Sequence, residues 1–155
     1  GTIDVTDDSH LCYLIGKTGL AEPGSVERKY LDWCFVSGNS GLQARALRAA
    51  AHLGDESIRP LCEAIVRRDW AFVRSLGIVK LNANPDDNDY QRLCFAAVEA
   101  LRTVGNADSI AALREGRRTM ASTLDWLTYD VAEEIYWRVT GGLANEPVAP
   151  GAKRH

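Results

Sequence analysis

Few residues of this sequence have the types and spacing that catalysis requires. The Gly-Lys-Thr-Gly stretch at residues 16–19 has the end of a phosphate-binding loop but lacks its earlier glycine and preceding strand. Cys12 follows His10 by two residues, and side chains two apart do not face each other on a helix. Glu133 and Glu134 are adjacent, so on a helix they would point about 100° apart, which is unsuitable for a pair of catalytic carboxylates. The sequence therefore predicts no enzyme active site.

The cysteines and histidines do not form a metal-binding pattern. No two cysteines have the C-x-x-C spacing, and each cysteine stands among apolar neighbours. His52 falls on the same predicted helix face as Arg45 and Arg48, which favours a polar surface position. We therefore expect buried, reduced thiols, no metal or cofactor, and a cytoplasmic location. The four cysteines are Cys12, Cys34, Cys62 and Cys94.

Positive charge is concentrated in the middle of the chain. The net charge is −3 over 155 residues, yet residues 45–80 carry seven basic and four acidic side chains. Arginine forms bidentate contacts with carboxylates and phosphates and stacks on aromatic rings. We predict a partner-binding basic face in this segment, although ordinary solvated helix faces would give the same pattern. The residues of this predicted basic face are Arg45, Arg48, Arg67, Arg68, Trp70 and Arg74.

The last predicted helix, residues 124–140, carries two separate stripes of side chains. Leu124, Val131 and Ile135 form an apolar stripe that is expected to pack inward. The second stripe consists of two large aromatic residues and two carboxylates, namely Trp126, Asp130, Glu133 and Trp137. A terminal helix has little need of two tryptophans outside its inward stripe. The second stripe is therefore predicted either to meet the N-terminal segment or to bind another chain.

Helical periodicity dominates the elements that must position these residues, and no segment alternates as a strand does. The expected helices cover residues 7–15, 25–36, 41–53, 55–67, 70–81, 89–104, 108–118 and 124–140. We expect Asp89 and Asp108 to cap the helices that they begin, and Gly54 to end the helix before it. The helix over 70–81 is apolar on nearly all sides, which predicts a position near the centre of the fold.

Two stretches of the chain match each other. Residues 42–61 and residues 93–113 each contain an alanine-rich helix, a turn that begins with glycine, and a helix that opens with Ile-x-x-Leu. Gly54 corresponds to Gly105, and Leu61 corresponds to Leu113 once one inserted residue is allowed. A single helical hairpin of this kind leaves one apolar side uncovered, so we expect such hairpins to stack on one another.

The matched pattern resembles HEAT repeats, in particular the short bacterial form. The resemblance is clearest over residues 41–118 and extends to 119–141. It implies an all-α fold, a short right-handed stack of antiparallel helical hairpins that forms an α–α superhelix. We accordingly expect a helical N-terminal cap at residues 1–40, HEAT-like repeats at 41–142 and a flexible tail at 143–155. HEAT-like proteins include some that bind DNA through a concave basic face.

Composition and the missing motifs limit the function. Apolar residues make up 46% and charged residues 25%, as in ordinary soluble domains. No apolar run approaches the roughly 20 residues of a membrane span, so we expect no membrane partner. The acidic, polar start of the sequence predicts no secretion signal. The leading hypothesis is a non-catalytic protein–protein interaction module, a scaffold or adaptor that stands alone or belongs to a larger protein.

Besides an enzyme with an unrecognised pocket or a small-molecule binder between helices, two further alternatives remain open. The first is a nucleic-acid-binding protein that uses residues 45–80, and its affinity would fall steeply as salt concentration rises. The second is an inhibitor or immunity-type partner of another protein, which the acidic charge and small size of the chain would suit.

Overall fold

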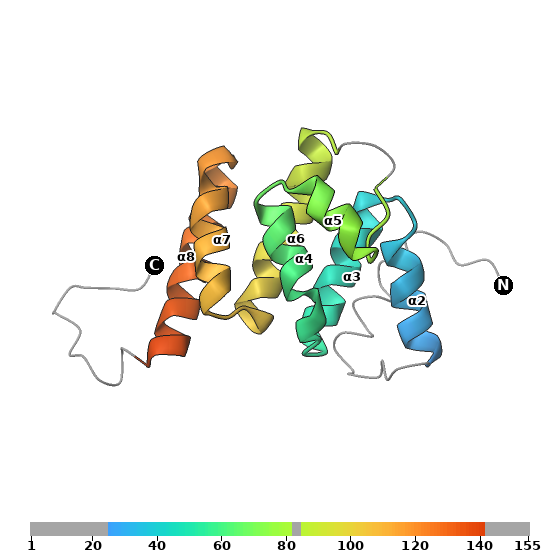
Figure 1. The fold of residues 1–155 in the computed structure, drawn as a ribbon, viewed down its shortest axis with the longest axis horizontal. Coiled ribbons are helices and arrows are strands. Elements are labelled where there is room, and N and C mark those ends of the chain that lie inside the picture. Colours follow the sequence, from blue (N-terminus) through green and yellow to red (C-terminus); the bar gives the residue numbers. More distant parts are fainter. Residues whose placement is uncertain (1–24, 82–84, 142–155) are drawn as a thin grey trace, which may run out of the picture.

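The described part of the chain, residues 25–81 and 85–141 of a computed structural model, is helical and contains no strand. Its seven α-helices are α2 (Val26–Phe35), α3 (Ser40–His52), α4 (Arg59–Val66), α5 (Trp70–Leu76), α6 (Asp87–Val104), α7 (Ala107–Gly116) and α8 (Ser122–Thr140). Two short 3₁₀ helices, η1 (Glu56–Ile58) and η2 (Arg117–Thr119), precede α4 and follow α7. Figure 1 shows the helices side by side, from α2 at one end to α7 and α8 at the other. The predicted all-α class is confirmed, whereas the predicted helix at 7–15 and the tail at 143–155 lie outside the described residues.

The two matched stretches fold into corresponding pairs of helices. The first stretch gives α3 and α4, the second gives α6 and α7, and α3 packs along α6 while α4 packs against α7. The corresponding residues Leu61 and Leu113 are both fully buried. The two turns differ, because Gly54 is left-handed with a φ of 74° and Gly105 is extended with a φ of −70°. The internal match therefore concerns the helices and their packing rather than the turn between them.

Helices α6 and α7 begin earlier than the sequence predicts, because an earlier residue caps each of them. Asp86 caps α6, since its carboxylate accepts a hydrogen bond from the Asp89 N–H at 2.8 Å. Asn106 caps α7, since its side chain accepts from the Asp108 N–H at 3.0 Å. The Ser109 hydroxyl in turn accepts from the Asn106 N–H at 3.1 Å and completes a reciprocal cap. A short polar residue, Asp86 or Asn106, precedes each predicted cap, and in both helices this earlier residue is the N-cap.

Helix α5 is shorter and less central than the predicted helix over 70–81. It ends at Leu76 because Gly77 adopts the left-handed conformation, with a φ of 69°. Val73 is its one fully buried residue, and the Phe72 side chain is 44% exposed. The prediction was wrong because the apolar residues of 70–81 serve two elements. Some pack α5 against α4, and others, such as Val79, anchor the segment that follows.

A buried glutamine joins the end of α2 to the segment after α5. Gln43 on α3 is only 2% exposed, and its amide Nε2 donates hydrogen bonds to the carbonyl oxygens of Phe35 at 3.0 Å and Lys80 at 2.8 Å. The Lys80 N–H also donates to the Phe35 oxygen at 3.2 Å. One side chain thus satisfies backbone groups from two segments that are far apart in the sequence.

Replacing Gln43 with leucine is expected to lower the free energy of unfolding by about 1–2 kcal/mol, because the Lys80 carbonyl loses its donor away from water. Urea denaturation followed by circular dichroism measures the change. The matched control is Gln91→Leu on α6, a half-exposed position for which a change within about 0.5 kcal/mol is expected. Equal losses in the two variants would show that the buried hydrogen bonds of Gln43 do not matter.

Candidate binding surfaces

The residues of the predicted basic face lie in two groups. Arg45 and Arg48 project from α3 into a groove shared with α6 and α8. The other four lie where α4 ends and on α5: Arg67, Arg68, Trp70 and Arg74. The first group lines a groove, whereas the arginines of the second group at the end of α4 lie beside carboxylates of other helices.

Carboxylates already pair with the arginines at the end of α4. The Arg67 Nε lies 2.8 Å from Glu115 Oε2 on α7, and the Arg68 Nη2 lies 3.4 Å from Asp87 Oδ1 at the start of α6. Each of these partners comes from an element that packs nearby rather than from the neighbouring sequence. The positive charge that this group offers to a partner is therefore smaller than the sequence indicates.

The same group surrounds a buried tyrosine that ties α4 to α6. The Arg68 guanidinium lies 3.7 Å from the centre of the Tyr90 ring, and Trp70 meets that ring edge-on at 6.1 Å. The Tyr90 hydroxyl donates a hydrogen bond to the Val66 carbonyl at 3.1 Å. Arg68 has a φ of 58°, a left-handed conformation that costs free energy in a residue other than glycine. These contacts hold Arg68 and Trp70 in the fold, which indicates a structural role for both.

The groove between α3, α6 and α8 is the concave part of the positive surface. Its volume is about 590 Å³, within the range of small-molecule sites. The residues that line it include three arginines and no carboxylate, and its main polar and aromatic members are Arg45, Arg48, Gln91, Arg92, Phe95 and Thr123. Packing of α3 along α6 brings Arg45 and Arg48 beside Arg92 and Phe95, which lie on α6, 47 positions later in the sequence.

Arg48 forms the inner wall of the groove and is held on two sides. Its Nε lies 3.1 Å from Glu99 Oε1, and its guanidinium lies 5.3 Å from the centre of the Phe95 ring. Both partners belong to α6, one turn apart, so Arg48 links α3 to α6. Its charge is partly balanced by Glu99, and its orientation is fixed.

Arg45 and Arg92 have fewer partners. Among the described residues the Arg45 side chain forms no ion pair or hydrogen bond, and the one polar contact of the Arg92 side chain is the 3.4 Å hydrogen bond that its Nη1 donates to the Ser40 hydroxyl. Sequence reasoning identified Arg45 but missed Arg92 and Phe95. The signal was their spacing of three on the exposed side of a predicted helix, but nothing in the sequence says that this side meets α3.

The exposed surface of α8 around its predicted second stripe holds two tyrosines in addition to the two predicted tryptophans. Trp126 is 66% exposed, and Trp137 is half-buried against Tyr136, with ring centres 5.8 Å apart. Tyr129 and Tyr136, which lie between Trp126 and Trp137 in the sequence, are also exposed. We call this surface the aromatic face of α8; it consists of Trp126, Tyr129, Asp130, Glu133, Tyr136 and Trp137.

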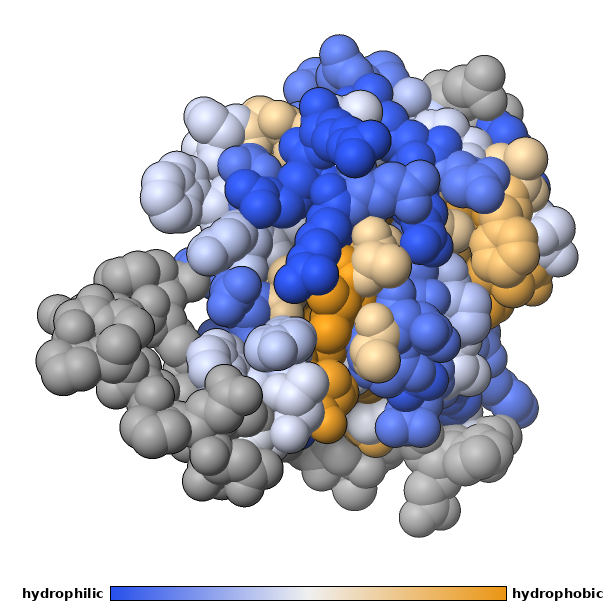
Figure 2. Space-filling view, turned by 60° about the vertical axis from the view of Figure 1, so that its left-hand side comes forward, coloured by the Kyte–Doolittle hydropathy of each residue, from blue (hydrophilic) through white to orange (hydrophobic). Residues whose placement is uncertain are grey.

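Figure 2 brings the end of the molecule that carries α7 and α8 toward the reader. A narrow hydrophobic strip runs down this view between hydrophilic and nearly neutral surfaces. The exposed surface of the described residues here is therefore mixed in character.

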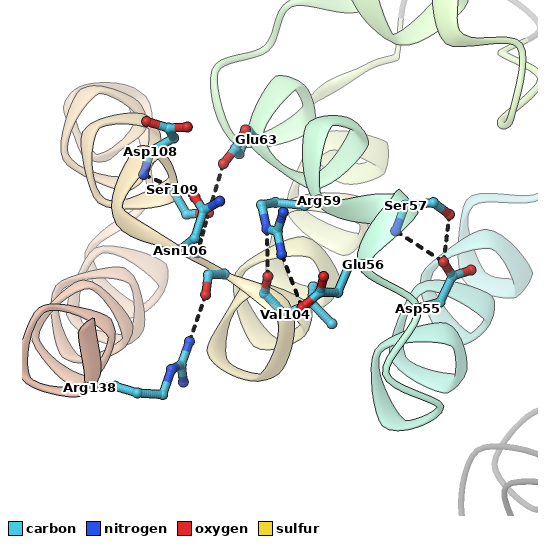
Figure 3. A network of polar contacts seen from close by, with 11 residues as sticks. Asp55, Glu56, Ser57, Arg59, Glu63, Val104, Asn106, Asp108, Ser109 and Arg138 are labelled. Carbon is cyan, nitrogen blue, oxygen red and sulfur yellow. Dashed lines mark hydrogen bonds and ion pairs between the residues drawn. The ribbon is translucent and has the colours of Figure 1, made fainter.

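Polar contacts fix α8 against the rest of the fold. Arg138 donates hydrogen bonds to the carbonyl oxygens of Arg102 and Gly105, at 2.5 and 2.8 Å, and Figure 3 shows its side chain reaching the turn between α6 and α7. Near the other end of α8, the Arg117 Nε donates to Asp125 Oδ1 at 2.6 Å. This hydrogen bond lowers the pKa of the Asp125 carboxyl below its ordinary value. Both ends of α8 are thus held, and its aromatic face is presented on a firm helix.

The same turn is bound from α4. The Arg59 Nε donates to the Val104 carbonyl at 2.7 Å, and the Ser109 hydroxyl donates to Glu63 Oε2 at 2.7 Å (Figure 3). Contacts from α4 and α8 therefore meet at one turn, which sets the position of α8 relative to α6 and hence the shape of the groove.

Burial makes Cys62 and Cys94 unreactive. Cys34, Cys62 and Cys94 are buried thiols, as predicted, while Cys12 lies outside the described residues. Burial raises the pKa of Cys94 to about 11 and raises the pKa of Cys62 further. These thiols therefore stay protonated at neutral pH and act as small apolar side chains.

No protein-family model, curated protein or solved structure matches this chain. Over residues 25–81 and 85–141, no group of three or more histidine, cysteine, aspartate or glutamate residues is placed to hold a metal ion. None of the helices in these ranges combines the length and the apolar character that a membrane crossing needs. Fold and surface define an all-α protein with a basic groove and an aromatic helix face.

Proposed function

We propose that this chain is a non-catalytic protein-interaction module that binds a partner protein through the aromatic face of α8. The observation that carries the proposal is the exposure of Trp126, at 66%, on a helix that is held at both ends. Tryptophan and tyrosine supply a disproportionate share of the binding energy at protein interfaces. A rigid helix that presents them loses little conformational entropy on binding.

The charges of this face favour a basic partner segment. Asp130 and Glu133 lie between the rings of Trp126 and Trp137 along α8. Lysine or arginine side chains of a partner can pair with these carboxylates and stack on the exposed rings, while apolar partner residues cover the ring edges. We therefore expect the partner to present a surface that combines basic and apolar residues.

A stack of HEAT-like hairpins is the architecture that we propose for the module. It is supported by the packing of α3 along α6 and of α4 against α7, and by the burial of corresponding residues in the two pairs. The buried thiols of the described residues support a reducing compartment such as the cytoplasm. An inhibitor or immunity role would use the same aromatic face, and the identity of the partner would distinguish the two.

Nucleic-acid binding through residues 45–80 receives less support. Arg67 and Arg68 are paired with Glu115 and Asp87, and Arg48 is paired with Glu99. A nucleic-acid interface depends on arginines and lysines that are available to several phosphates at once.

The test is a binding experiment with a photo-reactive residue in place of Tyr129, an exposed position on the same face that leaves Trp126 intact. Crosslinking in a cell extract identifies the partner, which is then purified and titrated against the wild-type chain and against Trp126→Ala. We expect Trp126→Ala to weaken binding at least about tenfold, as the loss of an interface hot spot does. The matched control is Trp33→Ala on α2, a tryptophan that is 51% exposed at the opposite end of the molecule (Figure 1). Unchanged affinity in Trp126→Ala, or equal losses in both variants, would contradict the proposal.

A further inference from the structure

We infer that the groove between α3, α6 and α8 binds a small aromatic phosphate, a phosphate monoester attached to a planar ring. This site is separate from the partner surface proposed above, because it is formed by Arg45, Arg92 and Phe95 rather than by the aromatic face of α8. Its shape, its charge and its exposed ring support the inference in turn.

The shape of the groove suits a small molecule. Its volume of about 590 Å³ lies in the middle of the range for ligand sites, and three helices contribute to its wall. Gly41 and Ala44 leave the α3 side of the groove open, since neither carries a large side chain. The space is therefore open where a flat group would enter.

The charge of the groove suits a doubly charged oxyanion. Arg45 and Arg92 line it without any carboxylate partner among the described residues, and Arg48 lies beside them. Glu99 and Asp89, on the same helix as Arg92, do not line the groove, and they are engaged by Arg48 and by the Ser40 hydroxyl. A phosphate monoester is close to a dianion at neutral pH and has enough oxygens to accept from two guanidinium groups at once.

The start of α8 adds to this positive potential. Ala121 precedes the helix and provides no side-chain cap, and both Ala121 and Thr123 line the groove. The first backbone N–H groups of this 19-residue helix are therefore left for another acceptor. The arginines establish the site, and the helix start strengthens it.

The Phe95 ring supplies the specificity for an aromatic group. It is 41% exposed, it lines the groove, and Arg48 holds it from the α3 side. Its exposed surface lies in a groove lined by arginines, where a planar group can stack on it. A planar ring that carries a phosphate can stack on Phe95 while its phosphate reaches Arg45 and Arg92.

The test is isothermal titration of the full chain with phenyl phosphate, inorganic phosphate, benzoate and AMP at low salt. We expect saturable binding of phenyl phosphate and AMP, and binding at least about tenfold weaker for inorganic phosphate and benzoate. Phenyl phosphate binding without AMP binding would restrict the ligand to small-ring phosphates. Absence of phenyl phosphate binding at millimolar concentration would overturn the inference.

Variants separate the two parts of the proposed ligand. Arg45→Gln combined with Arg92→Gln is expected to weaken phenyl phosphate binding at least about tenfold, as the loss of two charge-assisted contacts requires. Phe95→Ala should weaken phenyl phosphate binding and leave inorganic phosphate unaffected. The control Arg114→Gln removes an exposed arginine on α7 and should change neither. Circular dichroism confirms that each variant folds, and equal effects of the control and the double variant would overturn the inference. Trp126→Ala should bind phenyl phosphate normally, so this inference and the proposed function can fail separately.

Discussion

Replacing Tyr90 with alanine is expected to lower the free energy of unfolding by roughly 3–5 kcal/mol, the range for loss of a fully buried aromatic side chain. Tyr90 is 1% exposed, its ring is stacked under Arg68 and flanked by Trp70, and its hydroxyl reaches the Val66 carbonyl. The change removes contacts to α4 and α5 at once. Since small domains are stable by about 5–15 kcal/mol, the variant should have a much lower urea midpoint. Urea denaturation followed by tryptophan fluorescence measures it.

The conservative change Tyr90→Phe divides this effect into its parts. It keeps the ring and removes the hydrogen bond to Val66, so a loss of about 0.5–1.5 kcal/mol is expected. If the phenylalanine and alanine variants were equally unstable, ring packing against Arg68 and Trp70 would not be the source of the stability.

The same residue makes stability depend on pH in the alkaline range. Burial raises the pKa of Tyr90 from its ordinary value of 10.0 to about 12. The phenol therefore ionises more easily in the unfolded chain than in the folded one. Its contribution to stability is complete below pH 10 and is lost as the pH rises from 10 to about 12. Between these values the wild-type chain should lose stability more steeply than Tyr90→Phe.

Replacing Gly116 with valine is expected to cost about 3 kcal/mol, at the upper end for overpacking of a well-packed core. Gly116 is buried at the end of α7, where a Cβ atom would lie 2.6 Å from the carbonyl oxygen of Val66 and 3.1 Å from its carbonyl carbon. Its own backbone is right-handed helical, with a φ of −65°, so conformational freedom is not the reason for glycine here. The reason is the close approach of α7 to the end of α4, and the backbone of Val66 cannot move without disturbing its bond to Tyr90.

The matched control for this change is Ala111→Val, an exposed position in the same helix. It introduces the same side chain and is expected to cost only about 0.5 kcal/mol through helix propensity. Thermal unfolding of both variants measures the difference. Similar losses at the two positions would mean that the contact between α7 and Val66 is looser than the structure indicates.

Amphipathic periodicity was sufficient to predict the longest helices and the inward stripe of α8. Leu124, Val131 and Ile135 are buried as their spacing predicts. The failure over residues 70–81 has a local cause, because Gly77 ends α5 by a left-handed turn that an apolar run does not reveal. Composition also could not show that α5 lies at the surface, since its position is set by which helices pack around it.

The candidate groove could be predicted only in part, because it joins residues about fifty positions apart. The spacing of Arg45 and Arg48 indicated a basic face, but Arg92 and Phe95 reach them only through the packing of α3 along α6. The same reason explains the reduced charge of Arg67, whose partner Glu115 lies 48 positions later. Pairing between distant residues depends on which helices pack together, and the local periodicity of a single sequence does not reveal this.

The central place of α6 has a consequence for how the chain folds. Helix α6 packs on α3, α4 and α8, whereas α2 packs on α3 and α7 packs on α4 and α8 within the described ranges. The contacts between α3 and α6 close a loop that contains α4 and α5, so the conformational entropy of that loop must be lost before these native contacts form. We therefore expect the pairing of α3 with α6 to limit the folding rate, after which the outer helices can pack. The two ends of the molecule are then free to open separately while the middle remains folded.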